Sequence, residues 1–259
     1  MEIKTISKSL ILGVRIDTLR FKEALAWVAS IINGPSATMQ YIVTPNPEIL
    51  VDAARNDSFR AALNGSSLSI ADGTGTFIVG LLLGIRIPSR ITGIDFAEAL
   101  FASYAERPLQ VFLVGGEEGV AARAAKFLEK RYSIHRFIPA SFSPFIRPDG
   151  VFVYDYEQKR IITEAIHSNA DIVLVGFGAP KQELWMSTYA SILTGIRLAI
   201  GVGGALDVWA GKKIRAPKPL RALGLEWLWR LTLEPQRFGR IFKAVIIFPL
   251  LAILLRKKQ

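Results

Sequence analysis

Four polar residues of this chain are placed where they could carry out group-transfer chemistry: Thr44, Asn46, Asp72 and Gln182. Asp72 ends an apolar run and precedes a glycine-rich turn, where a carboxylate can act as a general base. The alternative is that it only caps the following helix. Thr44 and Asn46 could present a hydroxyl and an amide to a sugar, or simply form a turn fixed by two prolines. Gln182 follows a proline, and its position alone favours solvated surface.

The elements that must position these residues alternate between short apolar runs and amphipathic helical patterns through residues 1–210. We expect strands at residues 10–16, 40–44, 67–71, 110–114, 171–175 and 197–202, with a weaker one at 134–138. Helical periodicity covers residues 18–32, 95–106, 118–131 and 156–169. Nearly continuous apolar strands that alternate with helices predict an α/β fold, with a mainly parallel, Rossmann-like sheet covered by helices on both faces.

Polar or glycine-rich segments follow five of the expected strands. They are TPNPE (44–48), DGTG (72–75), GGEEG (115–119), GFGAPKQE (176–183) and GVGGALD (201–207). Because ligands of parallel sheets bind beyond the carboxyl ends of the strands, five such loops predict a shared crevice. Gly115 and Gly116 lack the GxGxxG spacing of dinucleotide sites, but their N–H groups could still lie near a phosphate.

The sequence gives no sign of a metal site. It has no cysteine, and the two histidines, His135 and His167, lie far apart without a carboxylate at ligand spacing. No DxD motif occurs, and the nearest match is Asp155-Tyr156-Glu157. We therefore expect no dedicated metal and no cofactor, so that arginine, lysine or helix dipoles would have to stabilise a phosphate leaving group.

The net charge of +10 is confined to one end of the chain. Residues 1–210 hold equal numbers of basic and acidic residues, whereas residues 211–259 hold twelve Lys and Arg against only Glu226 and Glu234. This asymmetry predicts an anionic partner for the C-terminal segment. We expect an α/β domain at 1–210 and a basic, aromatic helical appendage at 211–259.

Within the appendage, we expect one helix over residues 220–233 and another that begins at Pro235. Arg230, Arg237 and Arg240 would share one side if the chain bends only gently at Pro235; the alternative is a solvated basic face. The apolar run 244–255 would reach about 18 Å as a helix, short of the ~30 Å hydrocarbon core. We expect it to lie in a membrane interface or to pack on protein.

Two further classes of partner or compartment are disfavoured. An apolar run beside the arginines fits nucleic acid poorly, so we expect no nucleic-acid partner. The first ten residues, MEIKTISKSL, have no apolar core of a signal peptide, so we expect a cytoplasmic location.

Several longer motifs resemble one known family. TPNPE (44–48), ADGTG (71–75), RITGIDF (90–96), VGFGAPKQELW (175–185), GVGGALDVWAGKKIRAP (201–217) and GLEWLWRLTLEPQRFGR (224–240) are similar to the WecG/TagA/CpsF family of bacterial glycosyltransferases. The resemblance implies inverting, metal-independent transfer of a sugar of the N-acetylmannosamine type. The donor would be a UDP-sugar, and the acceptor a sugar linked to undecaprenyl diphosphate at the cytoplasmic membrane face, in surface polysaccharide or teichoic acid synthesis.

The resemblance also implies roles for residues. Asp72 would be the catalytic base, Gln182 would lie beside the reacting sugars, and Thr44 and Asn46 would line the sugar pocket. The appendage would attach the protein to the membrane and bind the acceptor diphosphate through Arg230, Arg237 and Arg240. The UDP moiety would be bound around Gly115, Gly116, Gly178, Lys181, Gly203, Gly204 and Asp207.

The sequence leaves alternatives open. Within the same family, the donor could carry glucose or a uronic acid for exopolysaccharide synthesis. Outside it, the chain could be a nucleotide-sugar epimerase or dehydrogenase, which the missing GxGxxG disfavours, or a non-catalytic membrane scaffold. The residues that follow Arg240 exceed the shorter family members, so this stretch could anchor the protein or pack on a partner subunit of a homo-oligomer.

Overall fold

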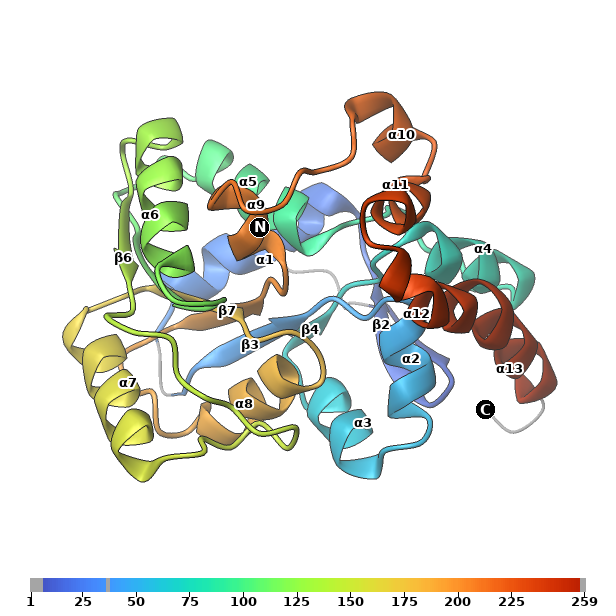
Figure 1. The fold of residues 1–259 in the computed structure, drawn as a ribbon, viewed down its shortest axis with the longest axis horizontal. Helices are drawn as coiled ribbons and strands as arrows, with labels where there is room; N and C mark the ends of the chain where they lie inside the picture. The colour runs from blue at the N-terminus through green and yellow to red at the C-terminus, as the bar shows by residue number, and fades with distance from the viewer. Residues whose placement is uncertain (1–6, 36–37, 257–259) are drawn as a thin grey trace.

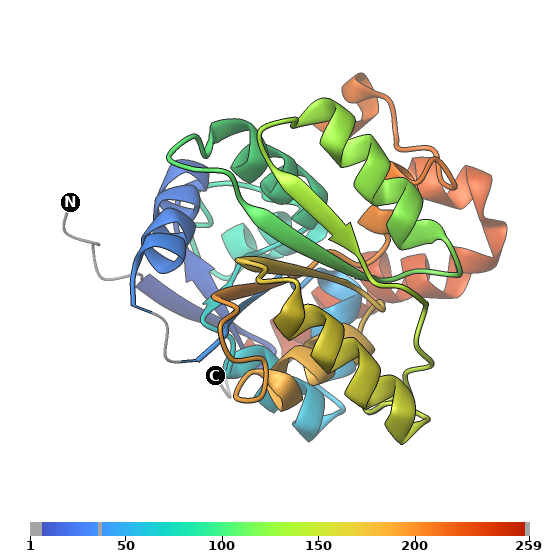
Figure 2. The same ribbon diagram turned by 90° about the vertical axis from the view of Figure 1, so that its left-hand side faces the viewer.

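A six-stranded sheet in the order β4-β3-β8-β7-β5-β6 runs through the protein, and all neighbouring strands are parallel. The computed structural model describes residues 7–35 and 38–256. Helices cover both faces of the sheet (Figure 2), which confirms the predicted α/β class. The strands are β3 (Gln40–Val43), β4 (Leu68–Ser69), β5 (Gln110–Gly115), β6 (Arg136–Pro139), β7 (Ile172–Gly176) and β8 (Leu198–Gly201).

Alternating strand residues build two separate cores, one on each face of the sheet. In β7, Val173 and Val175 face one core, whereas Ile172 and Leu174 face the other. Successive side chains of a strand point to opposite faces, so a strand covered on both faces must be apolar throughout. One core is completed by α2 (Pro47–Ala53), α3 (Asp57–Asn64), α7 (Asp155–His167) and α8 (Lys181–Tyr189), and the other by α1 (Phe21–Asn33), α5 (Gly93–Ser103), α6 (Val120–Arg131) and α9 (Ala205–Trp209).

The first expected strand, residues 10–16, is wrong as a single element. It is a hairpin of β1 (Ser7–Ile11) and antiparallel β2 (Val14–Thr18), separate from the main sheet. Leu12 and Gly13 have φ angles of 52° and 75°. A two-residue hairpin turn with positive φ at both positions matches the twist of its strands, so the chain reverses where the apolar pattern predicts continuity.

The C-terminal segment forms a chain of short helices that lies beside the sheet (Figure 1). It contains α10 (Lys218–Ala222), α11 (Glu226–Leu233), a 3₁₀ turn (Pro235–Arg237), α12 (Phe238–Phe242), a π-helical turn (Lys243–Ile247) and α13 (Phe248–Leu254). The expected single helix over 220–233 is therefore wrong, because the chain breaks at Gly224, whose φ is +76°. The expected start of a helical turn at Pro235 is confirmed.

Helix α13 packs on the body of the protein. Its Phe248 and Ala252 are fully buried and belong to the core that contains Leu50 of α2 and Val79 of α4 (Thr74–Leu82). The apolar tail is thus partly a core element, and deleting it would uncover this core. Among the described residues, no helix has both the length and the apolarity needed to cross a bilayer.

Gly224 is where the C-terminal segment meets the loop after β4. The Oγ1 of Thr74 donates a hydrogen bond to the Gly224 carbonyl at 3.1 Å and accepts one from Arg90 at 2.9 Å. A Cβ at Gly224 would overlap this Oγ1. Close approach of the Thr74 side chain to this backbone therefore requires a glycine here.

We predict that Gly224→Ala destabilises the protein more than Gly84→Ala does. Both residues have nearly the same φ, +76° and +79°, but a Cβ at Gly84 meets nothing within 4 Å. The backbone strain should be common to both variants, and the overlap at Gly224 should add about 1–3 kcal/mol. Chemical denaturation measures the difference, and equal losses in the two variants would contradict the tight contact.

Candidate functional site

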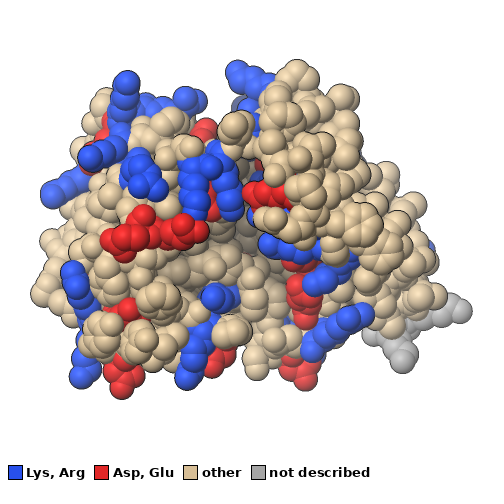
Figure 3. All heavy atoms as spheres, in the orientation of Figure 1, with Lys and Arg blue, Asp and Glu red and all other residues tan. Residues whose placement is uncertain are grey.

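The five predicted loops all lie at the carboxyl edge of the sheet, because every strand they follow is parallel. The connection from β3 to β4 and that from β5 to β6 lead toward opposite edges of the sheet, with β8 and β7 between them. Such a change of direction leaves a crevice beyond the strand ends. Figure 3 shows a hollow there, between the strand ends and the C-terminal helices, with basic side chains along one side.

The loops after β3 and β4 bring Thr44, Asn46 and Asp72 together. The Asp72 N–H donates to the carbonyl of Pro45 at 3.0 Å. The Asn46 Oδ1 accepts the Ile49 N–H at 3.0 Å and caps α2, and Thr44 is buried. Asn46 therefore has the turn-forming role that was one of its two alternatives, beside the carboxylate predicted as the base.

Asp72 sits in an environment that opposes its charge. Desolvation by burial raises the pKa of its carboxyl to about 7, although the nearby Arg230 guanidinium lowers it. The residue as a whole nevertheless keeps partial solvent access. It does not cap α4 with its side chain, because the N-cap position is Gly73. A partly accessible carboxylate that titrates near neutrality suits proton transfer.

Gln182 is buried, so the prediction of solvated surface is wrong. Its Oε1 accepts the Gly203 N–H at 3.0 Å, and its Nε2 donates to Glu183 Oε1 at 2.8 Å. The spacing of Gln182 from Trp185, Met186 and Tyr189 is that of one helix face, and all four are buried. This i, i+3, i+4, i+7 pattern was visible in the sequence and could have predicted the burial.

Gln182 and Thr44 approach the same strand end. A side chain on Gly201, at the end of β8, would come within 2.9 Å of the Gln182 amide nitrogen. A Cβ on Gly93 would meet both Thr44 Oγ1 and the Gly201 carbonyl oxygen at 3.4 Å. The site around β3 and the site around β8 are therefore contiguous, and glycines make that approach possible.

Glu183 is a polar residue of the site that sequence reasoning missed. It is 1% exposed, and burial raises the pKa of its carboxyl to about 7, against the hydrogen bond from Gln182. Its second oxygen, Oε2, is buried without a hydrogen-bond partner among the described residues. Glu183 lies off the apolar stripe of α8, so no pattern in the sequence indicated its burial.

The glycines predicted to bind UDP fall into two groups. The N–H of Gly116 donates to Gly176 at 3.2 Å and that of Gly203 donates to Gln182, while a Cβ on Gly115 would clash with Gly176. These three glycines hold the loops together. By contrast, a Cβ on Gly178 or on Gly204 would meet nothing within 4 Å, so there is open space beside these two residues.

Two lysines of the GKKIRAP motif reach toward the glycine loops. Lys213 pairs with Asp207 at 3.0 Å, and Lys212 pairs at 2.5 Å with Glu117, which follows Gly116. Lys181, the lysine predicted to bind UDP, begins α8 and is partly exposed. These contacts put positive charge beside the loops after β5 and β8.

The three predicted arginines have different partners. Arg230 pairs with Glu226 at 2.6 Å, and both act electrostatically on Asp72. Arg240 crosses to the first turn of α2, where it pairs with Glu48 at 2.7 Å. Arg237 pairs with Glu234 inside the C-terminal segment. Thus Arg230 and Arg240 border the candidate site, whereas Arg237 braces a turn.

Asp95 is a second residue that sequence reasoning missed, and it fixes the start of the C-terminal segment. It pairs with Arg215 at 2.6 Å and with Arg221 at 3.5 Å. Although desolvation opposes the shift, hydrogen bonds from Arg215 and Thr92 hold the pKa of Asp95 below its usual value. Asp95 belongs to the motif RITGIDF, and Arg215 belongs to the motif GKKIRAP. These two motifs therefore include a contact that holds the C-terminal segment on the body of the protein.

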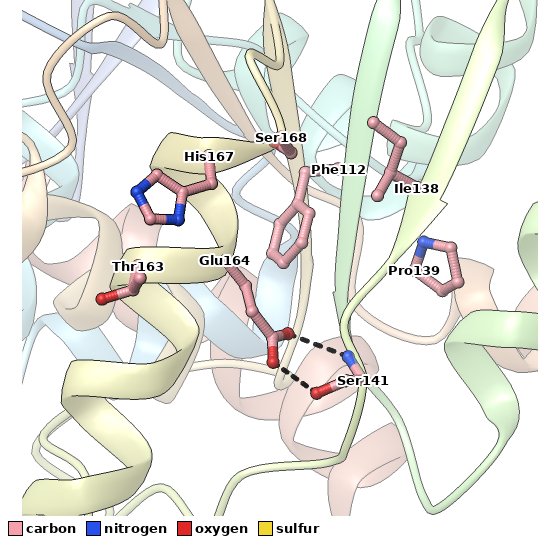
Figure 4. Close-up of a pocket in the computed structure, with 8 residues that line it drawn as sticks. All are labelled: Phe112, Ile138, Pro139, Ser141, Thr163, Glu164, His167 and Ser168. Carbon is pink, nitrogen blue, oxygen red and sulfur yellow. Dashed lines mark hydrogen bonds between the residues drawn. The ribbon is translucent and has the colours of Figure 1, made fainter.

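A separate pocket lies between α7 and the ends of β5 and β6 (Figure 4). Its Glu164 points at Ser141, accepts the Ser141 N–H at 3.0 Å and its hydroxyl, and also pairs with Arg160 at 3.0 Å. None of the predicted site residues lines this pocket. The Glu164 carboxylate holds the loop after β6 onto α7.

The two histidines lie in different surroundings. His135 is buried between the Leu109 N–H and the Phe101 carbonyl, and His167 is exposed on α7. Across residues 7–35 and 38–256, no group of three or more His, Asp or Glu side chains is arranged to hold a metal ion.

We predict that Glu183→Gln removes part of the pH dependence of stability. With a pKa of about 7 in the folded protein against the ordinary 4.5, Glu183 holds a proton that the unfolded chain loses. Its contribution to the free energy of unfolding therefore falls as the pH rises from 4.5 to about 7. Over that range, the stability of the variant relative to the wild type should increase by about 1 kcal/mol per pH unit. Denaturation at several pH values measures this gain. The exposed Glu129→Gln should show none, and a constant Glu183→Gln difference would contradict the buried acid.

Comparison with known proteins extends the motif resemblance over nearly the whole chain. Residues 9–259 match the model of the glycosyl transferase WecG/TagA/CpsF family. A relative from Staphylococcus aureus strain MRSA252, named N-acetylglucosaminyldiphosphoundecaprenol N-acetyl-beta-D-mannosaminyltransferase, is 31% identical over 238 residues, which cover 92% of this chain and 89% of the relative. The protein of that name from strain NCTC 8325 / PS 47 matches to the same extent. The chain therefore belongs to the WecG/TagA/CpsF family and is a glycosyltransferase.

Proposed function

We propose that this enzyme transfers a sugar of the N-acetylmannosamine type from a UDP-sugar to a sugar linked to undecaprenyl diphosphate, with inversion at the anomeric carbon. The names of the Staphylococcus aureus relatives support both the transferred sugar and the acceptor. The observation that carries the proposal is Asp72, a partly accessible carboxylate with a pKa of about 7 in the hollow beyond the strand ends.

The proposed reaction is a single displacement. The acceptor hydroxyl attacks the anomeric carbon, a new C–O bond forms, and the bond between that carbon and the UDP oxygen breaks. Asp72 takes the hydroxyl proton, so the attacking oxygen gains nucleophilicity as it approaches. A base near pKa 7 combines a useful ionised fraction with enough basicity to accept the proton.

The neighbours of Asp72 position the two sugars. Thr44 and Asn46 lie on the loop beside Asp72, and Gln182 approaches the same strand end from α8. We assign Gln182 to the reacting sugars and Thr44 and Asn46 to the sugar pocket. Holding both substrates in this geometry reduces the entropic part of the barrier.

Positive side chains, rather than a dedicated metal ion, would stabilise the departing UDP. Lys212 and Lys213 lie beside the loops after β5 and β8, and Lys181 begins α8. Gly178 and Gly204 offer open backbone for phosphate contacts, while Gly115, Gly116 and Gly203 shape the loops. Full activity in the presence of a chelator such as EDTA would agree with this assignment.

The C-terminal segment, residues 211–259, would act as a functional unit that attaches the catalytic body, residues 1–210, to the cytoplasmic face of the membrane and binds the acceptor diphosphate. Arg230 and Arg240 border the site, and their present partners, Glu226 and Glu48, could be exchanged for a diphosphate. Arg237 would join them after leaving Glu234. The Arg230 and Arg240 side chains are exposed, so these two pairs cost little to break.

The choice of donor sugar rests mainly on the names of the relatives. Donors with glucose or a uronic acid remain the alternative within the family. An assay that offers UDP-N-acetylmannosamine, UDP-glucose and UDP-glucuronic acid with one short-chain lipid-diphosphate acceptor distinguishes them. Transfer of N-acetylmannosamine should be fastest.

We predict that Asp72→Asn lowers kcat for this transfer by about 10²–10⁴-fold, the usual contribution of general-base catalysis. The amide keeps the size of the side chain, so the fold should remain. Asp149→Asn, which removes an exposed carboxylate paired with Arg147 at 3.1 Å, is the matched control and should retain activity. Near-normal turnover of Asp72→Asn would overturn the assignment of the base.

We also predict that kcat/KM rises with pH through about 7, because Asp72 must lose its proton before it can act as a base. Arg230→Gln removes a positive charge that lowers the pKa of Asp72, so the rise should move to higher pH. The exposed Arg55→Gln should leave the profile in place. A profile that Arg230→Gln does not move would contradict the electrostatic contact.

A further inference from the structure

The outer face of helix α4 is apolar where a surface helix is normally polar. Phe77, Ile78, Leu81 and Leu82 are 40–68% exposed, while Thr76, Val79 and Gly80 on the opposite side are buried. Helix α4 is thus hydrophobic all round although only one side is covered by protein. Helices of that kind are expected inside a core or a membrane.

Helix α13 repeats this arrangement beside α4. Leu250, Ile253 and Leu254 are 52–74% exposed, while Phe248 and Ala252 pack into the core. The two helices are in contact and lie side by side in Figure 1. We call their seven exposed side chains the apolar face: Phe77, Ile78, Leu81, Leu82, Leu250, Ile253 and Leu254. Contiguous exposed patches of this sort mark interaction sites.

The charges around the apolar face indicate what covers it. No acidic residue occurs from position 73 to 94 or from 235 to 259. Each apolar helix is followed by an exposed arginine, Arg86 after α4 and Arg256 after α13. Figure 3 shows the right-hand end of the molecule, where these helices lie, as largely uncharged. The acidic residues of neighbouring α2, Glu48 and Asp52, are paired with Arg240 and Lys243. Apolar side chains flanked by exposed arginines are suited to a surface with an apolar interior and anionic headgroups.

We propose that the apolar face docks on an anionic bilayer, with α4 of the catalytic body entering the interface together with α13. This goes beyond attachment by the C-terminal segment alone, and it rests on the proposed use of a lipid-linked acceptor. Helix α4 begins two residues after Asp72. Docking through α4 therefore holds the proposed base close to the headgroup layer, where the diphosphate of a lipid-linked acceptor lies.

The test is binding of the full chain to vesicles of phosphatidylcholine alone or mixed equally with phosphatidylglycerol. Two double variants divide the face: Ile78→Gln with Leu81→Gln in α4, and Ile253→Gln with Leu254→Gln in α13. Each should weaken binding to the anionic vesicles by about tenfold or more, since two apolar side chains leave the interface. The matched control is Phe127→Gln on α6, which is 42% exposed and distant in sequence from both helices.

All the substituted side chains are exposed, so the variants should fold, which near-ultraviolet circular dichroism checks. We expect the α4 variant to keep its sugar-transfer activity on a short-chain acceptor assayed without detergent. The same variant should lose its activity on a long-chain acceptor embedded in vesicles. Wild-type vesicle binding by the α4 variant would overturn the proposal. Unchanged vesicle binding with a smaller oligomer in light scattering would instead assign the face to a subunit contact.

Failure of the proposed function gives a different result. A wild-type protein that binds anionic vesicles through both helices but transfers no sugar from any UDP donor would leave the docking face standing and refute the substrate assignment.

Discussion

Desolvation of the Asp72 carboxyl, which raises its pKa, is the constraint on which the proposed chemistry depends. In water a carboxyl such as Asp72 would be ionised and weakly basic at neutral pH. Burial raises its pKa to about 7, and Arg230 limits the rise. Arg230 and Glu226 both come from α11, so the environment of Asp72 is made by the body and the C-terminal segment together. The Thr74–Gly224 contact and the pairing of Asp95 with Arg215 hold that segment in place.

This dependence explains why the two parts of the chain are not separable in a simple way. The charge distribution divides the chain near residue 211, yet Phe248 and Ala252 complete a core with residues of α2 and α4. Removing the C-terminal segment would change that core as well as the site. Point substitutions at exposed or polar positions therefore test function more sharply than truncation does.

The sequence predicted the sheet and its loops because those depend on local patterns. Apolar runs such as 171–175 and the glycines after them indicated the strands, their approximate ends and the shared crevice. It failed where a single residue's conformation or a tertiary contact decides the outcome. Leu12 and Gly13 reverse the chain, Gly224 breaks a helix, and Glu183 is buried off the apolar stripe. Membership of the family excludes the epimerase, dehydrogenase and scaffold alternatives, none of which the residues alone had removed.

A single orientation of the protein on a bilayer would then suit the apolar face, the candidate base and the basic residues. A bilayer beneath α4 and α13 would deliver the lipid diphosphate toward Arg230 and Arg240, while UDP-sugar would enter the hollow from the aqueous side. The proposed mechanism depends above all on an Asp72 carboxyl that titrates near neutrality. Carbon-13 NMR of the aspartate carboxyl groups, with the Asp72 signal assigned by its loss in Asp72→Asn, measures that pKa directly. We predict a midpoint near 7; a midpoint near the ordinary value of about 4 would contradict the assignment of Asp72 as the base.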